Sequence, residues 1–189
     1  ELLAGLGGGD AAVVQGPGIG LDAAVLDIGG AELLVAKTDP ITFATDAIGY
    51  YAVAVNSNDL AACGARPRWM MAVLLLPAGG ADEDMARDAF RQLGEACDAF
   101  RITMVGGHTE VTSAVSQPVV VASMLGLVPR NGLVTPAGLR AGDVLLLAGS
   151  AGVEGTAVIA RERGPDLLAR GYSEDAVRRC AGFLHDPGI

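Results

Sequence analysis

A helix predicted from about residue 47 to 63 constrains the fold more than any other stretch, because it carries two polar side chains on an otherwise apolar surface. Its packing residues are mostly small or aliphatic, which suits close contact with a sheet. Asn56 and Asp59 are three positions apart, so they lie on one face of this helix. Buried polar groups cost free energy unless a partner satisfies them. The pattern therefore predicts that an amide and a carboxylate point together toward a polar ligand.

A strand pair before this helix brings two more aspartates toward it. The glycine pair at 29–30 predicts an antiparallel hairpin. Asp22 precedes the first strand, whereas Thr38 and Asp39 follow the second, where a turn containing proline is expected. The start of one strand and the end of its antiparallel partner lie at the same edge. We therefore expect a cation, or a ligand carrying one, near Asp39 and Asp59.

The next elements continue an alternation of strands and helices. Further strands are predicted over 69–76, 102–105 and 118–128, and an amphipathic helix over 82–100 with Asp82 as its N-cap. With the hairpin and the first helix, they give the order ββαβαββ. The segment Gly106-Gly107-His108-Thr109-Glu110 follows a short strand and is predicted as a glycine loop.

The chain is predicted to contain a complete first domain over 1–136 and part of a second domain over 137–189. In the second part, a buried strand is expected over 144–148, with helices over about 154–163 and 173–184. A strand and two helices cannot bury a core of their own. We therefore interpret this part as the incomplete start of a second α/β domain.

Composition and charge narrow the classes of function. The net charge of −9 argues against nucleic acid or an anionic membrane as the main partner. The sequence contains no apolar run of about 18 residues, the length that a membrane-spanning helix needs. Its three cysteines form neither a CxxC pair nor an even disulfide set, which predicts a reducing, cytoplasmic location.

The acceptor-bearing side chains and the glycine segments together favour Mg²⁺ and a nucleotide. Mg²⁺ prefers oxygen ligands and bridges carboxylates to phosphates. Glycine segments over 16–20, with Gly18 and Gly20, and at Gly106-Gly107 would let backbone N–H groups approach phosphates. Neither segment is a Walker A motif. The acceptor-bearing side chains stand at the predicted ends of strands and helices: Asp22, Asp39, Asn56, Asp59, His108 and Glu110.

Each of these residues also has a structural interpretation. Asp22 and Asp39 are of a type common in turns. Asn56 and Asp59 can hydrogen-bond a neighbouring loop. His108 is compatible with a metal ligand, a phosphate donor or a satisfied loop histidine. The sequence alone leaves these alternatives open.

Lys37 is the only lysine of the chain. Strand alternation turns its side chain away from Ala36 and Thr38. A contact with a phosphate and a solvated side chain are equally compatible with this position.

Four motifs in order resemble the aminoimidazole ribonucleotide synthetase superfamily. They are Asp22-Ala23-Ala24-Val25, Thr38-Asp39, Asn58-Asp59-Leu60-Ala61 with Gly64-Ala65-Arg66-Pro67, and Gly106-Gly107-His108-Thr109-Glu110. This superfamily includes thiamine-monophosphate kinase, selenophosphate synthetase and the carbamoyl dehydratase of hydrogenase maturation. The similarity is greatest to the hydrogenase-maturation type and its less characterised relatives, and it extends over nearly the whole chain.

The resemblance implies an α/β (α+β) fold, with a mixed or antiparallel sheet and packed helices, that forms a homodimer through its sheets. It implies ATP and Mg²⁺ as cofactors, with Asp22, Asp39 and Asp59 at positions that hold the metal and the triphosphate. It implies catalytic roles for Asp39, Asp59 and His108. The implied nucleotide contacts are Gly18, Gly20, Asp22, Thr38, Asn56, Gly106, Gly107 and Glu110.

The leading hypothesis is an enzyme of the hydrogenase-maturation type that activates an acyl or amide oxygen of a small acceptor by phosphoryl transfer, with a maturation protein as an expected partner. The alternatives are a small-molecule kinase similar to thiamine-monophosphate kinase and a non-catalytic nucleotide-binding relative. Leu21 and His108 motivate the last alternative, because relatives often have acids there. Selenophosphate synthesis is disfavoured, because no cysteine precedes Asp22.

Overall fold

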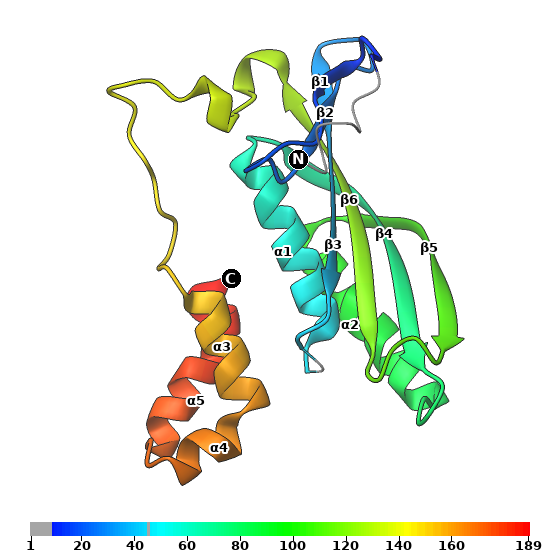
Figure 1. Cartoon of the computed structure of the whole chain (residues 1–189), viewed down its shortest axis with the longest axis vertical. Helices are drawn as coiled ribbons and strands as arrows, with labels where there is room; N and C mark the ends of the chain where they lie inside the picture. Colours follow the sequence, from blue (N-terminus) through cyan, green and yellow to red (C-terminus); the bar gives the residue numbers. More distant parts are fainter. Residues whose placement is uncertain (1–8, 45) are drawn as a thin grey trace. The chain divides into compact units, whose positions relative to one another are not determined.

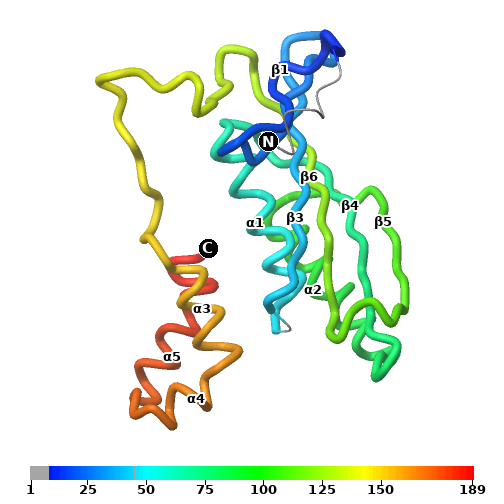
Figure 2. Tube along the Cα trace, viewed as in Figure 1, coloured from blue at the N-terminus to red at the C-terminus, as the bar shows by residue number. Residues whose placement is uncertain are grey.

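The computed structural model describes residues 9–44 and 46–189, which form two compact units (Figures 1 and 2). The start of the predicted first domain, residues 1–8, lies outside the described residues. The first unit contains a sheet and two long helices, and the second contains shorter helices. The units comprise Glu1–Thr42 with Ile48–Ala141, and Phe43–Ala47 with Gly142–Ile189.

The first unit is built on a six-stranded mixed sheet with the order β1-β2-β3-β6-β4-β5. Among the described strands, β4 and β5 are parallel and all other neighbours are antiparallel. From β2 onward the order of elements is the predicted ββαβαββ, which confirms the α/β fold class. The bounds are β1 (Val13–Gln15), β2 (Ala24–Leu26), β3 (Glu32–Ile41), α1 (Ile48–Ala62), β4 (Arg66–Pro77), α2 (Glu83–Phe100), β5 (Thr103–Thr112) and β6 (Val119–Pro129).

Helices α1 and α2 cover one face of this sheet, and the core lies beneath them (Figure 1). The two helices approach closely because Gly49 has no side chain: a Cβ at this position would lie 2.5 Å from the backbone nitrogen of Leu93. Asp82 caps α2 as predicted, since its side chain accepts a hydrogen bond from the backbone N–H of Met85. Alternate residues of the central strands are buried toward the helices: Met70, Ala72, Leu74, Leu76, Val120, Ala122, Met124 and Val128.

Strand β3 is longer than predicted, and the expected turn at Pro40 does not form. Its pairing with β6 continues through Asp39 and Pro40 to Ile41. Strand β2 pairs only with 34–36 of β3, so Pro40 lies where β3 has a single neighbour. Proline is tolerated at such an edge, because its missing N–H is not needed for a second ladder.

The predicted glycine loop after residue 105 is also wrong, because Gly106 to Glu110 lie inside β5. This part of β5 pairs in parallel with 71–75 of β4. A Cβ at Gly107 would lie 1.9 Å from the carbonyl oxygen of Ala72. Close approach of the two strands, rather than a loop around a ligand, therefore accounts for glycine at this position in the structure.

The second unit contains α3 (Val153–Glu162), α4 (Gly164–Ala169), α5 (Glu174–Gly182) and a final helical turn (Leu184–Gly188). The helices near 154–163 and 173–184 were predicted, whereas α4 was not. Helix α3 packs against α5, and Ala157, Ala160 and Leu184 are buried. The boundary at 136/137 between two family domains stays a prediction.

The strand predicted over 144–148 is not formed. Val144, Leu145, Leu146 and Leu147 are between 71% and 92% exposed. A strand needs a neighbour to satisfy its backbone groups, and the described part of the second unit contains no strand that could pair with this run.

Two sequence expectations concern the chain as a whole. The cysteines Cys63, Cys97 and Cys180 are free, so the prediction that they form no disulfide agrees with the structure. Within the described residues, none of the helices has both the length and the apolar character required to cross a membrane.

Candidate functional site

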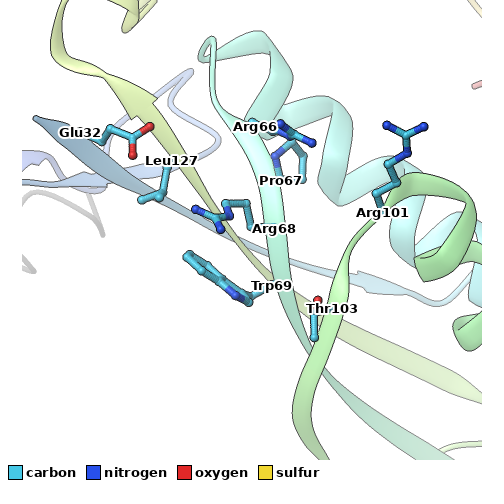
Figure 3. A pocket seen from close by; sticks show the side chains of 8 residues that line it. All are labelled: Glu32, Arg66, Pro67, Arg68, Trp69, Arg101, Thr103 and Leu127. Carbon is cyan, nitrogen blue, oxygen red and sulfur yellow. The ribbon is translucent and has the colours of Figure 1, made fainter.

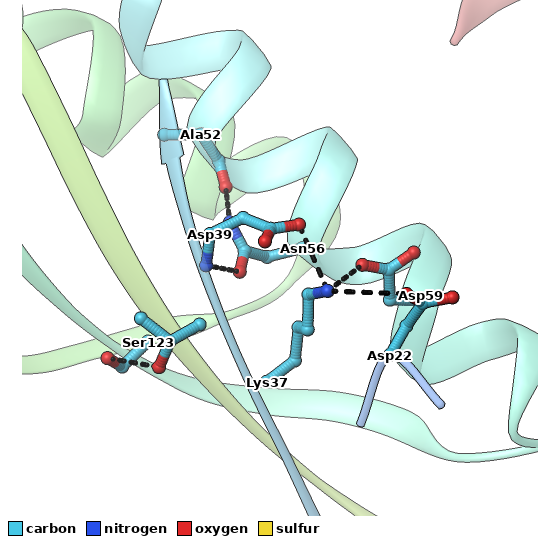
Figure 4. Close-up of polar contacts among 8 residues, drawn as sticks. Asp22, Lys37, Asp39, Ala52, Asn56, Asp59 and Ser123 are labelled. Carbon is cyan, nitrogen blue, oxygen red and sulfur yellow. Dashed lines mark hydrogen bonds and ion pairs between the residues drawn. The ribbon is translucent and has the colours of Figure 1, made fainter. Parts of the chain in front are cut away.

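Three aspartates converge on one cation in the first unit, and this cation is the ammonium group of Lys37 (Figure 4). Its Nζ atom lies 3.2 Å from a carboxylate oxygen of Asp39 on the same strand. It lies 3.0 Å from an oxygen of Asp59 on α1 and 4.0 Å from an oxygen of Asp22, which precedes β2. We call Asp22, Lys37, Asp39 and Asp59 the acidic cluster.

The local structure explains why these groups meet. Lys37 and Asp39 are two positions apart on β3, so both point from the face that α1 covers. The opposite register positions on β6 are the buried residues Met124 and Ala122, which face the same side. Asp59 comes from α1, the helix that packs over this face.

Asn56 joins β3 to α1 beside the cluster. Its side-chain oxygen accepts a hydrogen bond from the backbone N–H of Asp39 at 3.1 Å, and its nitrogen donates to the carbonyl of Ala52 at 2.9 Å. The side chain is fully buried, and both ends of its amide have a backbone partner. Asn56 therefore positions the backbone of Asp39. Both interpretations of Asn56, as a structural residue and as a residue of the site, are compatible with these contacts.

The cluster is an interior group that opens to solvent at one side. The side chain of Lys37 is only 11% exposed, whereas that of Asp22 is 74% exposed. Asp39 and Asp59 are intermediate, at 33% and 27%. A ligand would therefore approach from the side of Asp22.

The electrostatics of the cluster follow from one positive and three negative charges. Burial opposes the charge on Lys37, but hydrogen bonds to Asp59 and Asp39 outweigh this effect and raise the pKa of Lys37 above its ordinary value. Burial, with the neighbouring carboxylates of Asp39 and Asp22, raises the pKa of Asp59 in spite of Lys37. One ammonium group does not balance three carboxylates, so the cluster keeps a net negative charge.

His108 and Glu110 are not brought to the acidic cluster. They lie on β5 at register positions opposite Val73 and Leu75, which alternate with the buried Leu74. Their side chains are therefore on the face of the sheet away from the helices, and β6 and β4 separate their strand from β3. They lie 4.0 Å from each other and are exposed.

Thr38 also points away from the cluster. Its hydroxyl group lies 2.9 Å from the hydroxyl of Ser123 on β6, on the face opposite Asp39. Gly18 and Gly20 lie in the loop that leads to Asp22, and Gly20 has a φ of 74°, which favours glycine. Gly106 and Gly107 are paired residues of β5, as described above.

The structure also contains a pocket of about 430 Å³ that includes none of the predicted site residues (Figure 3). It lies at the end of the sheet where β4 and β5 begin. Three guanidinium groups and one carboxylate line it, so it does not supply the oxygen ligands that a divalent ion needs. Its residues are Glu32, Arg66, Pro67, Arg68, Trp69, Arg101, Thr103 and Leu127.

The acidic cluster contains the type of ligand that a divalent ion prefers, because three carboxylates from separate segments converge on one cation. Their present arrangement does not form a metal centre. Among the described residues, no group of three histidine, cysteine, aspartate or glutamate side chains could hold a metal ion. The ammonium group of Lys37 stands at the point of convergence instead.

The sequence analysis left open what the side chain of Lys37 contacts. Strand alternation is the signal that could have placed it beside Asp39. A side chain turned away from Ala36 and Thr38 points to the same side as Asp39, two positions further along β3. The same rule separates Thr38 from Asp39, although both were predicted to contact the nucleotide.

Comparison with known proteins defines the class to which this architecture belongs. Residues 20–128, more than half of the chain, match the family described as AIR synthase related protein, N-terminal domain. The chain therefore belongs to the AIR synthase-related family. This agrees with the mixed sheet, its covering helices and the resemblance in the sequence motifs.

Among its relatives is a putative hydrogenase expression/formation protein of Methanocaldococcus jannaschii, which is 28% identical over 79% of this chain and 47% of its own length. The thiamine-monophosphate kinase of Escherichia coli is 31% identical over 71% of this chain and 42% of its own length. A solved structure of the hydrogenase maturation protein HypE in complex with ATP superimposes with a TM-score of 0.63, at 28% identity, over 76% of this chain and 44% of that one. The chain thus spans less than half the length of these relatives.

Proposed function

We propose that this chain forms the nucleotide-binding part of an ATP- and Mg²⁺-dependent enzyme of the hydrogenase-maturation type. Its reaction would activate an acyl or amide oxygen of a small acceptor by phosphoryl transfer. The observation that carries the proposal is the convergence of Asp22, Asp39 and Asp59 around one cation. The structure of HypE with ATP supports nucleotide binding by a protein of similar fold and sequence.

Each residue of the acidic cluster has a role in this proposal. Asp39 and Asp59, with the more exposed Asp22, hold the metal that accompanies ATP, and Asn56 fixes the backbone at Asp39. Bound Mg²⁺ supplies neutralisation of phosphate charge, which is the main source of catalysis in phosphoryl transfer. It stays a prediction that the nucleotide also contacts the hydroxyl of Thr38, the glycines of the loop before Asp22, and Glu110. A catalytic role for His108 likewise stays a prediction.

A small-molecule kinase is the second candidate, and the 31% identity to thiamine-monophosphate kinase favours it. The two reactions differ in their products. A kinase leaves ADP and a stable phosphorylated acceptor, whereas activation of an amide oxygen leaves ADP, a dehydrated product and the inorganic phosphate that carries away the oxygen. Phosphorus NMR of the reaction mixture, with candidate acceptors present, separates these two outcomes.

Substitution of Asp39 or Asp59 by asparagine tests the proposal. Asn keeps the shape of the side chain but removes the charge that would hold the metal and its phosphates. We expect ATP hydrolysis to fall by roughly 100-fold or more in either variant, as is usual when a charge-stabilising group is lost. Hydrolysis is measured by phosphate release, and calorimetry reports the affinity for Mg²⁺-ATP.

Asp27→Asn is the matched control, because Asp27 is paired with Arg130 and is not part of the acidic cluster. This variant should hydrolyse ATP like the unsubstituted protein, and circular dichroism should show that all variants are folded. Unchanged turnover in Asp39→Asn or Asp59→Asn would contradict the proposal. Tight binding of ATP without hydrolysis by the unsubstituted chain would favour the non-catalytic alternative.

A further inference from the structure

Lys37 places a fixed positive charge where the carboxylates of the acidic cluster converge. We propose that Lys37 is an internal counterion, which closes the cluster to a free divalent ion and leaves the carboxylates only when the metal arrives together with nucleotide phosphates. This inference rests on the proposed nucleotide-binding function and adds an order of events to it.

The contacts of Lys37 show why the ammonium group and a metal ion exclude each other. The ammonium group reaches oxygens of Asp39 and Asp59 at hydrogen-bond distances of 3.2 and 3.0 Å. A Mg²⁺ ion needs its ligand oxygens at about 2.0–2.1 Å and in octahedral geometry. An ion at the same point would overlap the ammonium group, so one cation must leave before the other binds.

The burial of Lys37 separates it from an ordinary surface ion pair. Among the ion pairs of the described residues, Lys37 is the least exposed cation, at 11%, and the next is Arg161 at 23%. The surface pair of Arg87 with Glu83, for comparison, is more than 70% exposed on both sides. A buried ammonium group that loses its carboxylates remains costly unless it gains new acceptors.

The charges identify what can supply those acceptors. Free Mg²⁺ would bring two positive charges beside an ammonium group that has lost its partners. A nucleotide brings negative phosphate oxygens with the metal, and these can accept hydrogen bonds from the displaced ammonium group. The flexible four-carbon stem of lysine allows this movement without a change in the backbone. Metal and phosphate are therefore expected to enter together.

The single lysine of the chain makes the movement directly observable. Protein labelled with ¹³C at the lysine ε-carbon gives one lysine side-chain signal by NMR. We expect MgCl₂ alone, at concentrations far above those used for ATP, to leave this signal in place. Mg²⁺ with ATP should shift it. A signal that Mg²⁺ alone moves to the same position, or that bound Mg²⁺-ATP leaves in place, would overturn the inference.

A second experiment measures Mg²⁺ binding to nucleotide-free protein by calorimetry. Lys37→Met removes the charge and keeps much of the stem, so its carboxylates are free to bind the ion. We expect its affinity for Mg²⁺ to exceed that of the unsubstituted protein by about tenfold or more, because a cation at contact distance no longer opposes the metal. Lys37→Arg should stay close to the unsubstituted protein.

Arg130→Met is the matched control, because it also removes one positive charge from an ion pair of the first unit but frees only Asp27. It should not gain Mg²⁺ affinity. Equal affinity in Lys37→Met and in the unsubstituted protein would overturn the inference. If Lys37→Met does not fold, the NMR signal of Lys37 in the unsubstituted protein still tests the inference.

The two proposals fail in different ways. Loss of the proposed function would appear as absence of ATP binding and hydrolysis by the unsubstituted chain. The comparison of Mg²⁺ affinities uses no nucleotide, so it tests the counterion role of Lys37 independently of that outcome.

Discussion

Asn56 shows how a buried amide can set the geometry of a neighbouring site residue. It accepts a hydrogen bond from the N–H of Asp39 and donates one to the carbonyl of Ala52. A strand residue and a helix residue are thereby fixed to one side chain. The direction of Asp39 toward Lys37 depends on this connection, because the backbone of β3 carries both residues.

Replacement of Asn56 by alanine should therefore destabilise the protein by about 1–3 kcal/mol, the usual cost of leaving a buried polar group without its partner. Urea unfolding followed by circular dichroism gives the change in the free energy of unfolding. Asn58→Ala on the exposed side of the same helix is the control and should change stability by no more than about 0.5 kcal/mol. Equal losses in the two variants would contradict a positioning role for Asn56.

Residue spacing predicted part of the site because periodicity states which side chains share a face. The three-residue spacing of Asn56 and Asp59 and the hairpin at 29–30 both pointed to the region around Asp39, and the structure brings these residues together. Spacing does not state what satisfies a buried carboxylate. A metal was expected, whereas the structure has Lys37 at that point. His108 was placed in the site because it follows a short predicted strand and because of its motif, but the strand continues through it, and neither signal states which face of a strand a side chain takes.

At the scale of elements, the close contact between α1 and α2 depends on a missing side chain. Gly49→Ala would bring its Cβ to 2.5 Å from the backbone of Leu93, which cannot move as a flexible side chain can. We expect a loss of about 1–3 kcal/mol in the free energy of unfolding, which is typical of overpacking. Thermal and urea unfolding measure it.

Gly94→Ala on α2 is the opposite case and serves as the control. A Cβ there meets nothing within 4 Å, so the change should stabilise the helix by roughly 0.5–1 kcal/mol through reduced backbone freedom of the unfolded chain. A stabilising Gly49→Ala would show that the helices are more loosely packed than the structure indicates.

Helices were easier to predict than strand ends. Helix α1 was predicted from its run of small and aliphatic residues, and α2 from its apolar periodicity and the cap at Asp82, which are local properties. The extension of β3 past Pro40 and of β5 through Gly107 depends on pairing with distant strands. Proline and glycine normally indicate turns, but here the neighbouring strands decide their conformation. The run at 144–148 shows the converse, since a strand-like sequence without a neighbour stays irregular.

At the scale of the whole molecule, the sheet has one face that neither α1 nor α2 covers. Apolar side chains on it are partly exposed, and Met71 is 42% exposed. The predicted homodimer would bury this face against a second copy. The partly exposed residues include Leu34, Val73, Leu75, Val121 and Leu125.

Met71→Glu should therefore convert a dimer to a monomer, because a charge in the middle of an apolar interface must be desolvated. Analytical ultracentrifugation at micromolar concentration measures the change in mass. Phe90→Glu on α2 is the matched control, since Phe90 is similarly exposed, at 47%, but lies on a helix. A monomeric unsubstituted protein, or a dimer that survives Met71→Glu, would contradict the prediction.

The aliphatic side chains at 144–147 have a consequence for the life of this polypeptide in a cell. Short exposed aliphatic runs are what chaperones bind and what quality-control proteases use to select their clients. The abundance of the polypeptide would then depend on how quickly another surface covers Val144 to Leu147, and only secondarily on the free energy of unfolding of the sheet.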